Sequence, residues 1–233
     1  MSYRIADLDV KINNRFPFTD KFCKDYLVAD GERFDLEVSV SDEDLATEKK
    51  QSPDFSDGYI ENICIYRNIC NRMPAFNRFL MHCAVVEYGG KCYAFLGRSG
   101  TGKSTHTSLW LKNLPDAKIL NGDKPILLYD GSSFIVYGTP WQGKERLGYN
   151  GKCKLYGLCF LEQAKKNEIM RLTVGEAADR IFTQILLPND PVAVAKTLEL
   201  CDTLIKTVPL YLLKCDISDE AFQTSFNAME KGE

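Results

Sequence analysis

The residues most able to do chemistry lie in the stretch FLGRSGTGKSTHTSLW, residues 95–110, which contains the pattern Gly97-x4-Gly102-Lys103-Ser104. Glycines in such a loop let the backbone wrap closely around phosphate oxygens and point successive N–H groups inward. Lys103 supplies a cation for the β- and γ-phosphates, and Ser104 supplies a hydroxyl for Mg²⁺. The pattern predicts a nucleotide-phosphate site formed by Gly97, Arg98, Ser99, Gly100, Thr101, Gly102, Lys103, Ser104 and Thr105.

The flanking residues provide the context that a phosphate loop requires. Residues 79–97 read as two apolar strands joined at Gly89-Gly90, and residues 103–112 read as the following helix. The positive end of that helix favours phosphate. A phosphate-loop enzyme also needs an acidic residue after a neighbouring strand, and Asp123 in AKILNGDKP has that position. The alternative is that residues 121–123 form only a turn.

The remaining pattern predicts the elements that position these residues. The first 50 residues alternate apolar and polar positions as strands do, and residues 58–73 have helical spacing closed by Pro74. A hairpin turns at Asp130-Gly131, and a capping box at Thr173 begins a helix through about Leu187. Strands and helices interleave with many hairpins. We therefore expect an α/β fold with a mixed β-sheet flanked by helices.

We expect one domain over residues 1–233, with a strand-rich portion at 1–80 and a nucleotide-binding core at 81–233. The formal charge of −3 argues against nucleic acid or an anionic membrane as a partner. No apolar run approaches the ~20 residues that span a bilayer, and the first residues have no apolar segment typical of a signal peptide. Nine cysteines without a Cys-x-x-Cys pair indicate reduced thiols and a cytoplasmic protein.

A resemblance appears at MHCAVVEYGGKCYAFLGRSGTGKST, where Met81-His82 precedes a hairpin and then the glycine loop. The arrangement resembles the catalytic domain of HPr kinase/phosphorylase and ATP-dependent phosphoenolpyruvate carboxykinase. The segments GTGKSTHT, NGDKP and YGTPWQGK also look like those of small bacterial HPr-kinase-like proteins. The likeness covers roughly residues 80–160. It implies the phosphate-loop fold that these two families share.

The resemblance also implies roles for individual residues. Lys103 and Ser104 match the phosphate and Mg²⁺ positions, with Mn²⁺ as an alternative metal. Asp123 matches an acidic residue that binds metal or acts as catalytic base. His82 matches a strand histidine that ligates metal in the carboxykinases and lies near the reacting phosphate in the kinases. From the residues alone, a single histidine in an apolar strand is usually a core residue.

The chain departs from the resembled families at three points. Gly122 precedes Asp123 where those families have a second acid, so the division between metal ligand and general base stays open. Thr105 follows the loop serine, as in the carboxykinases, where HPr kinases have glutamate. Only about 80 residues precede His82, which is less than the N-terminal domain of an HPr kinase.

The loop YGTPWQGKERLG supplies further candidates. Lys144 is placed to neutralise charge on a transferred phosphoryl group, and Trp141 to line an acceptor pocket or cover the reacting phosphate. The alternative is a surface turn with a solvated lysine. His106 and Arg146 are weaker candidates, because His106 on the helix after the glycine loop faces either the site or the sheet.

Together these observations lead us to expect an HPr-kinase-like phosphotransferase. It would use ATP and Mg²⁺ to phosphorylate a hydroxyl on a small protein, a peptide or a metabolite, with catalysis by Asp123, Lys103, His82 and Lys144 and metal binding by Ser104, Asp123 and His82. Self-association is compatible with the resemblance. Three alternatives stay open: a regulatory, non-catalytic nucleotide-binding protein, a carboxykinase-like enzyme acting on a small organic acid, and a reversible enzyme that also dephosphorylates its product with inorganic phosphate.

Overall fold

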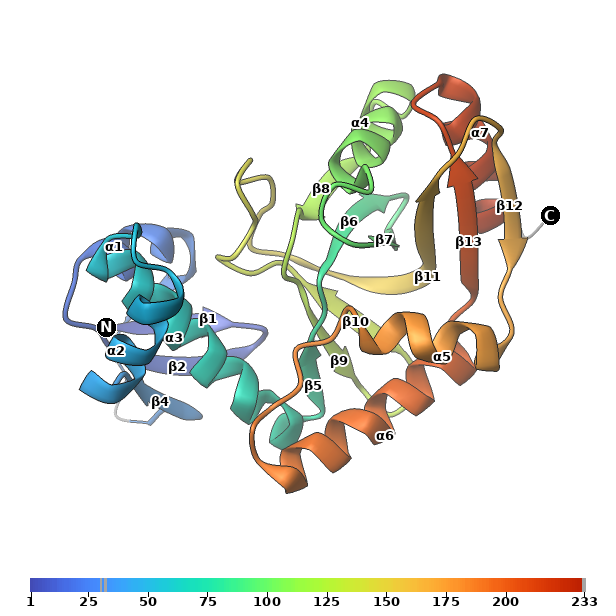
Figure 1. The fold of residues 1–233 in the computed structure, drawn as a ribbon. Coiled ribbons are helices and arrows are strands. Elements are labelled where there is room, and N and C mark those ends of the chain that lie inside the picture. Colours follow the sequence, from blue (N-terminus) through green and yellow to red (C-terminus); the bar gives the residue numbers. More distant parts are fainter. Residues whose placement is uncertain (30, 32, 232–233) are drawn as a thin grey trace.

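The computed structural model describes residues 1–29, 31 and 33–231 of the chain. Its N-terminal part, hereafter the N-terminal lobe, contains a four-stranded sheet in the order β3-β1-β2-β4 with helices packed beside it (Figure 1). The elements of this lobe are β1 (Ser2–Ile5), β2 (Leu8–Asn13), α1 (Phe18–Phe22), η1 (Lys24–Tyr26), β3 (Leu27–Val28), β4 (Leu36–Ser39), α2 (Asp42–Gln51) and α3 (Asp57–Arg72).

The rest of the chain forms a nine-stranded mixed sheet, hereafter the main sheet. Seven strands follow the order β5-β9-β10-β11-β7-β6-β8, while β13 pairs with β11 and with β12. The elements are η2 (Met73–Phe76), β5 (Arg78–Leu80), β6 (Cys83–Tyr88), β7 (Lys91–Leu96), α4 (Lys103–Asn113), β8 (Lys118–Asn121), β9 (Ile126–Tyr129), β10 (Phe134–Tyr137), β11 (Lys152–Gln163), β12 (Glu168–Arg171), α5 (Val174–Phe182), α6 (Pro191–Thr207), β13 (Leu210–Cys215), α7 (Asp219–Phe226) and η3 (Asn227–Lys231).

The expected α/β architecture with a mixed sheet and flanking helices is confirmed. The hairpin at Gly89-Gly90 joins β6 to β7, and the one at Asp130-Gly131 joins β9 to β10. One predicted boundary is wrong, since α5 ends at Phe182 rather than near Leu187. The backbone after it extends instead and pairs with the strand ahead of β6: the N–H of His82 donates to the carbonyl of Gln184 over 2.6 Å.

Helices cover both faces of the main sheet, with α4 and α7 on one side and α5 and α6 on the other (Figure 1). Successive side chains of each strand point to these two sides in turn. On β7, Tyr93 and Phe95 join the core under α4 and α7, whereas Cys92, Ala94 and Leu96 join the core under α5 and α6. Both faces of these strands are buried, which explains why their sequence is apolar without a break. All nine cysteines are buried.

Hydrogen bonds and apolar contacts join the N-terminal lobe to the main sheet. The carboxylate of Asp7 accepts hydrogen bonds from the Tyr137 hydroxyl over 2.7 Å and from Lys152 over 2.6 Å. Arg78 donates to the carbonyl of Ala6 over 2.9 Å. One hydrophobic cluster contains residues of both parts, including Ile65 of α3 and Ile126 of β9. In the part of the chain that the structure describes, no helix is both long and apolar enough to cross a membrane.

A buried polar cluster joins α4 to α7. The Ser225 hydroxyl accepts a hydrogen bond from Trp110 Nε1 over 3.1 Å, lies 3.0 Å from His106 Nε2, and donates to the carbonyl of Phe222 over 2.9 Å. Trp110 and Ser225 have no exposed surface, and His106 is 3% exposed. His106 therefore faces the core beneath α7, and burial lowers its pKa to about 4.

Replacing Ser225 with alanine should lower the free energy of unfolding by about 1–3 kcal/mol, because it leaves buried indole and imidazole nitrogens without a partner. Urea denaturation followed by circular dichroism measures the change. Thr224→Ala is the matched control, since that hydroxyl lies at the surface of the same helix. Equal losses for the two variants would contradict the importance of the cluster.

Candidate functional site

The site lies at one edge of the main sheet, where three chain segments meet. β6 runs antiparallel to both β7 and β8, with Cys83 opposite Leu96 and Val85 opposite Asn121. The start of β6 therefore lies beside the ends of β7 and β8. His82 precedes β6, the glycine loop of residues 97–102 follows β7, and Asp123 follows β8. The sheet topology brings together groups up to about 40 positions apart in the chain.

The glycine loop has backbone geometry that only glycine adopts readily. Gly97, Gly100 and Gly102 have φ of 153°, 84° and 100°. A Cβ on Gly97 would also approach Thr101 Oγ1 to 2.6 Å. Gly102 stands at the N-cap of α4 without a side-chain cap, so the first N–H groups of this helix are not bonded by a capping side chain.

Lys103 begins α4 and turns back over the loop. Its Nζ donates to the carbonyl of Gly97 over 2.7 Å. Burial lowers the pKa of Lys103, while the nearby carboxylate of Asp123 acts in the opposite direction. The lysine, Ser99, Gly100, Gly102, Ser104 and Thr105 line one cavity. Arg98 and Thr101 shape the loop instead: Thr101 Oγ1 donates to the carbonyl of Arg98 over 2.9 Å.

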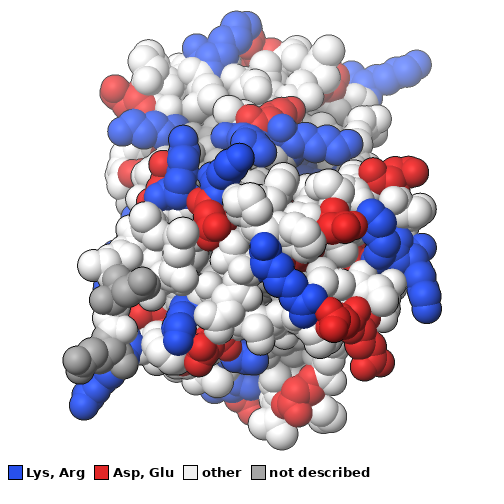
Figure 2. Space-filling view, turned by 90° about the vertical axis from the view of Figure 1, so that its left-hand side faces the viewer, with Lys and Arg blue, Asp and Glu red and all other residues white. Residues whose placement is uncertain are grey.

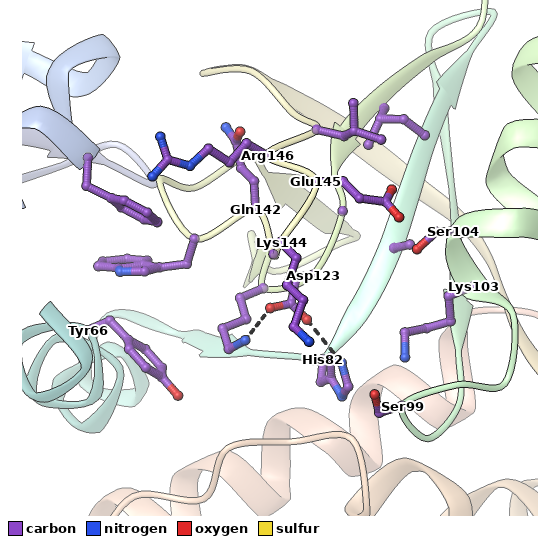
Figure 3. A pocket seen from close by; sticks show the side chains of 18 of the residues that line it. Tyr66, His82, Ser99, Lys103, Ser104, Asp123, Gln142, Lys144, Glu145 and Arg146 are labelled. Atoms are coloured by element: carbon purple, nitrogen blue, oxygen red, sulfur yellow. Dashed lines mark hydrogen bonds and ion pairs between the residues drawn. The ribbon is translucent and has the colours of Figure 1, made fainter. Parts of the chain in front are cut away.

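The carboxylate of Asp123 is held by nitrogen donors on both of its oxygens. His82 Nε2 lies 3.0 Å from Oδ1, and Lys124 Nζ bonds Oδ2 (Figure 3). The side chain of Asp123 is 19% exposed. Burial raises its pKa, but the hydrogen bonds from His82 and Lys124 outweigh burial and hold the pKa below its ordinary value of 3.8. The carboxylate is therefore ionised at neutral pH.

A buried network behind Asp123 fixes the direction of its side chain. Asn121 Oδ1 accepts the N–H of Asp123 over 2.9 Å and that of Lys124 over 2.8 Å. Asn121 Nδ2 in turn donates to the carbonyl and the hydroxyl of Thr139, and both residues have no exposed surface. Residues 121–123 are thus a turn, and that turn is what presents Asp123 to the cavity. Sequence reasoning missed Thr139, for which no spaced motif provides a signal.

The surroundings of position 122 leave no room for a side chain larger than that of glycine. A Cβ there would approach the carbonyl oxygen of Gln142 to 2.9 Å and that of Leu147 to 3.2 Å. The N–H of Gly122 also donates to Leu147 over 2.9 Å. The loop of residues 138–147 therefore packs on this turn where a second acidic side chain would need room.

The same loop supplies side chains to the cavity. Gln142, Lys144, Glu145 and Arg146 line it (Figure 3). The guanidinium of Arg146 lies 5.4 Å from the centre of the Phe22 ring. Trp141 also lines the cavity and is 4% exposed, with its ring 5.6 Å from that of Tyr66.

The cavity, of about 1040 Å³, brings most of the sequence-predicted residues together: His82, Lys103, Asp123 and Lys144 all line it. Sequence reasoning missed its opposite side, which α3 provides through Tyr59, Asn62, Ile63 and Tyr66. The helical spacing of residues 58–73 was visible, but spacing alone does not tell a helix face that lines a cavity from one that packs in the core. His106, by contrast, lies outside the cavity lining.

Within the described residues, no three His, Cys, Asp or Glu side chains are grouped so that they could hold a metal ion. Mg²⁺ does not need such a cage, because it is usually bound by one or two carboxylates together with substrate phosphates and water. Asp123 and the Ser104 hydroxyl fit that mode. His82 is already engaged with Asp123, which fits an orienting role as well as a ligand role.

The outer face on the side of the N-terminal lobe has no single sign of charge. Figure 2, which views the molecule from the side of the N-terminal lobe, shows basic and acidic side chains interspersed on this face. No protein-family model matches the chain, and no curated protein matches it significantly.

Replacing Lys124 with methionine should raise the pKa of the Asp123 carboxyl. Burial raises this pKa, and the variant loses one of the two side-chain hydrogen bonds that lower it. In the wild type, the ionised carboxylate stabilises the fold above pH 3.8, and this contribution is lost as the pH falls through the lower folded-state pKa. Titration of the carboxyl ¹³C signal by NMR measures the shift. Lys112→Met, on the surface of α4, is the control, and an Asp123 pKa that is equal in both variants would contradict the assignment.

Proposed function

We propose that this protein is an ATP- and Mg²⁺-dependent kinase that transfers the γ-phosphoryl group to a hydroxyl acceptor. One observation carries the proposal: a glycine loop at a helix N-terminus and a partly buried, ionised carboxylate line the same cavity. Phosphoryl transfer needs a site that binds the nucleotide phosphates and a base that accepts the proton of the attacking hydroxyl, and this cavity offers a residue set for each. The proposed fold type is that of HPr kinase and phosphoenolpyruvate carboxykinase, supported by the motifs at residues 80–160.

On the donor side, the loop and α4 bind and orient the phosphates. The N–H groups at the start of α4 and the glycine backbone favour negative charge. Among the residues that the structure describes, none forms an ion pair with Lys103, whose Nζ donates to the carbonyl oxygens of Gly97 and Arg98. It is therefore able to turn to the β- and γ-phosphate oxygens. Such preorganised positive charge is the main contribution of a protein to phosphoryl transfer.

Ser104 is placed to hold a magnesium ion bound together with the nucleotide, and Asp123 is the second ligand in the alternative in which it is not the general base. The ion, when bound, neutralises charge on the phosphate oxygens. Ser104 contributes its hydroxyl from the first turn of α4, and Asp123 its carboxylate from the neighbouring strand end. Mn²⁺, with similar ligand preferences, is the expected substitute.

On the acceptor side, Asp123 is placed to take the proton of the attacking hydroxyl. The acceptor oxygen forms a bond to the γ-phosphorus, the bond from that phosphorus to the bridging oxygen breaks, and ADP leaves with the electron pair. The proton passes to the Asp123 carboxylate. His82 keeps the carboxylate oriented by its contact to Oδ1, and Lys144 adds positive charge to the cavity.

One observation favours a second candidate, a nucleotide-binding regulator without catalysis. The residue before Asp123 is a glycine whose surroundings leave no room for a second carboxylate. ATP turnover distinguishes the two functions. Tight ATP binding without Mg²⁺-dependent hydrolysis or transfer would favour the regulator and overturn the kinase.

Lys103→Ala should reduce turnover by roughly 10²–10³, the usual cost of removing one preorganised charge-stabilising donor. ADP release in a coupled assay measures the rate, and isothermal titration calorimetry measures ATP binding. Lys112→Ala is the matched control on the same helix, because its side chain pairs with Asp219 away from the cavity. Unchanged turnover in Lys103→Ala would show that the glycine loop is not the phosphate site.

Asp123→Asn should reduce turnover by about 10²–10⁴, the contribution of a general base, while ATP binding is largely kept. The amide preserves the shape of the side chain but does not accept the proton. The same two assays separate the effects, with Asp179→Asn on the surface of α5 as control. If Asp123→Asn turned over ATP at the wild-type rate, Asp123 would be only a turn residue.

A further inference from the structure

Two tasks compete for Asp123 in the proposed reaction, binding of the metal and uptake of the acceptor proton. Both of its carboxylate oxygens are already engaged: His82 Nε2 lies 3.0 Å from Oδ1, and Lys124 Nζ bonds Oδ2. The ammonium group of Lys124 repels a divalent cation from the oxygen that it bonds. Because Mg²⁺ is usually bound by one or two carboxylates together with phosphates and water, a further carboxylate is expected near Ser104.

Two other carboxylates line the cavity among the residues that the structure describes, those of Asp54 and Glu145. Asp54 belongs to the segment before α3, on the side of the cavity that the N-terminal lobe provides. Glu145 belongs to the loop of residues 138–147. Figure 3 shows its carboxylate directed toward Ser104, whose hydroxyl is in the first turn of α4. Of the two, Glu145 is therefore the one on the phosphate side.

A tight turn places Glu145 near Asp123. The N–H of Arg146 donates to the carbonyl of Gly143 over 3.4 Å, so Lys144 and Glu145 are the two central residues of a β-turn. This turn starts directly against Asp123, because a Cβ on Gly143 would lie 3.0 Å from the Cβ of Asp123. Two residues extend a chain by at most roughly 7 Å. The backbone of Glu145 is therefore held close to the carboxylate that the site is built around.

Contacts on its C-terminal side also hold the turn in place. The guanidinium of Arg146 lies 5.4 Å from the centre of the Phe22 ring, and the carbonyl of Leu147 accepts the N–H of Gly122 over 2.9 Å. The turn is thus fixed to the N-terminal lobe and to the segment that carries Asp123. A metal ligand needs such support, because the site must hold it close to one geometry.

The carboxylate of Glu145 and the hydroxyl of Ser104 have no partner within the described part of the chain, where no residue forms a hydrogen bond or ion pair with either group. The two neighbours of Glu145 in sequence are cations, but neither neutralises it. Arg146 lies against Phe22, and Figure 3 shows Lys144 directed away from the Glu145 carboxylate. Both oxygens of Glu145 are therefore open to a cation, and Mg²⁺ prefers such hard oxygen donors.

We propose that Glu145 is the carboxylate ligand of the nucleotide-bound magnesium ion, together with the hydroxyl of Ser104. Glu145 supplies the second acidic group that the packing around Gly122 keeps from the position next to Asp123. Asp123 is thereby left to receive the proton of the acceptor hydroxyl. The inference rests on the proposed kinase function and assigns the metal site of that function to a loop outside the glycine-loop motif.

The effect of the metal on nucleotide affinity tests the assignment without turnover. Isothermal titration calorimetry measures the dissociation constant of AMP-PNP, a non-hydrolysable ATP analogue, with saturating Mg²⁺ and again in EDTA. Because metal and nucleotide binding are reciprocally coupled, the ratio of the EDTA constant to the Mg²⁺ constant reports how well the protein holds the metal in the complex. The affinity of free AMP-PNP for Mg²⁺ is the same for every variant and cancels in the comparison.

Glu145→Gln should lower this ratio about tenfold or more, since even the loss of an outer-shell partner typically costs a metal site that much affinity. Binding of AMP-PNP in EDTA should be kept, which also shows that the variant is folded. Glu145→Asp, which keeps the charge, should restore part of the ratio. Asp54→Asn is the matched control, because it removes one carboxylate from the same cavity on the side of the N-terminal lobe; its ratio should equal that of the wild type.

Steady-state turnover separates Glu145 from Asp123 by a second readout. Glu145→Gln should raise the Mg²⁺ concentration that gives half-maximal rate about tenfold and keep much of kcat at saturating Mg²⁺. Asp123→Asn should show the opposite pattern, with a lower kcat and a ratio of AMP-PNP constants close to that of the wild type. The two carboxylates are thereby assigned to different tasks.

Equal ratios for Glu145→Gln and Asp54→Asn would overturn the inference. A ratio that Asp123→Asn lowers and Glu145→Gln does not would also overturn it and assign the metal to Asp123. A ratio that Glu145→Gln alone lowers, in a protein whose wild type does not turn over ATP, would uphold the metal site and overturn the proposed kinase function instead.

Discussion

The antiparallel pairing of β6 with both β7 and β8 is the constraint on which the site depends. Because β6 starts where its two neighbours end, His82, the glycine loop and Asp123 converge on one edge of the main sheet. Both faces of these strands are buried under helices. A slip in the register of β6 would displace core side chains as well as site residues, so the stability of the core and the geometry of the site are protected by the same contacts.

Burial and charge are balanced at Asp123. A carboxylate that is four-fifths buried would tend to take up a proton, and two nitrogen donors prevent this. The turn that aims it is built from the side chain of Asn121, itself held by Thr139. The loop of residues 138–147 packs on that turn closely enough to require glycine at position 122. The glycine at position 122 is therefore a consequence of how this loop packs on the turn.

The N-terminal lobe gives the cavity its second side. It is anchored through Asp7, which bonds Tyr137 and Lys152, and through the apolar cluster that it shares with the main sheet. This anchoring holds α3 with one face against the core and another toward the glycine loop. The lobe thus has a part in the site in addition to its own small sheet. A cavity between two packed parts of a chain is a common place for a ligand.

The sequence alone determined the local features. The spacing of Gly97, Gly102 and Lys103 predicted a loop whose geometry depends on short-range steric effects. Alternation of apolar residues predicted strands, and Pro74 and the capping box at Thr173 predicted individual helix ends. The end of α5 was missed because pairing with the strand before His82 overrides local helix preference. The tertiary structure alone decided what depends on distant contacts: that His82 meets Asp123, that His106 faces the core, and that Tyr59 and Tyr66 line the cavity. These outcomes follow from strand pairing and lobe packing, which join residues far apart in the chain and therefore have no periodic signal in the sequence.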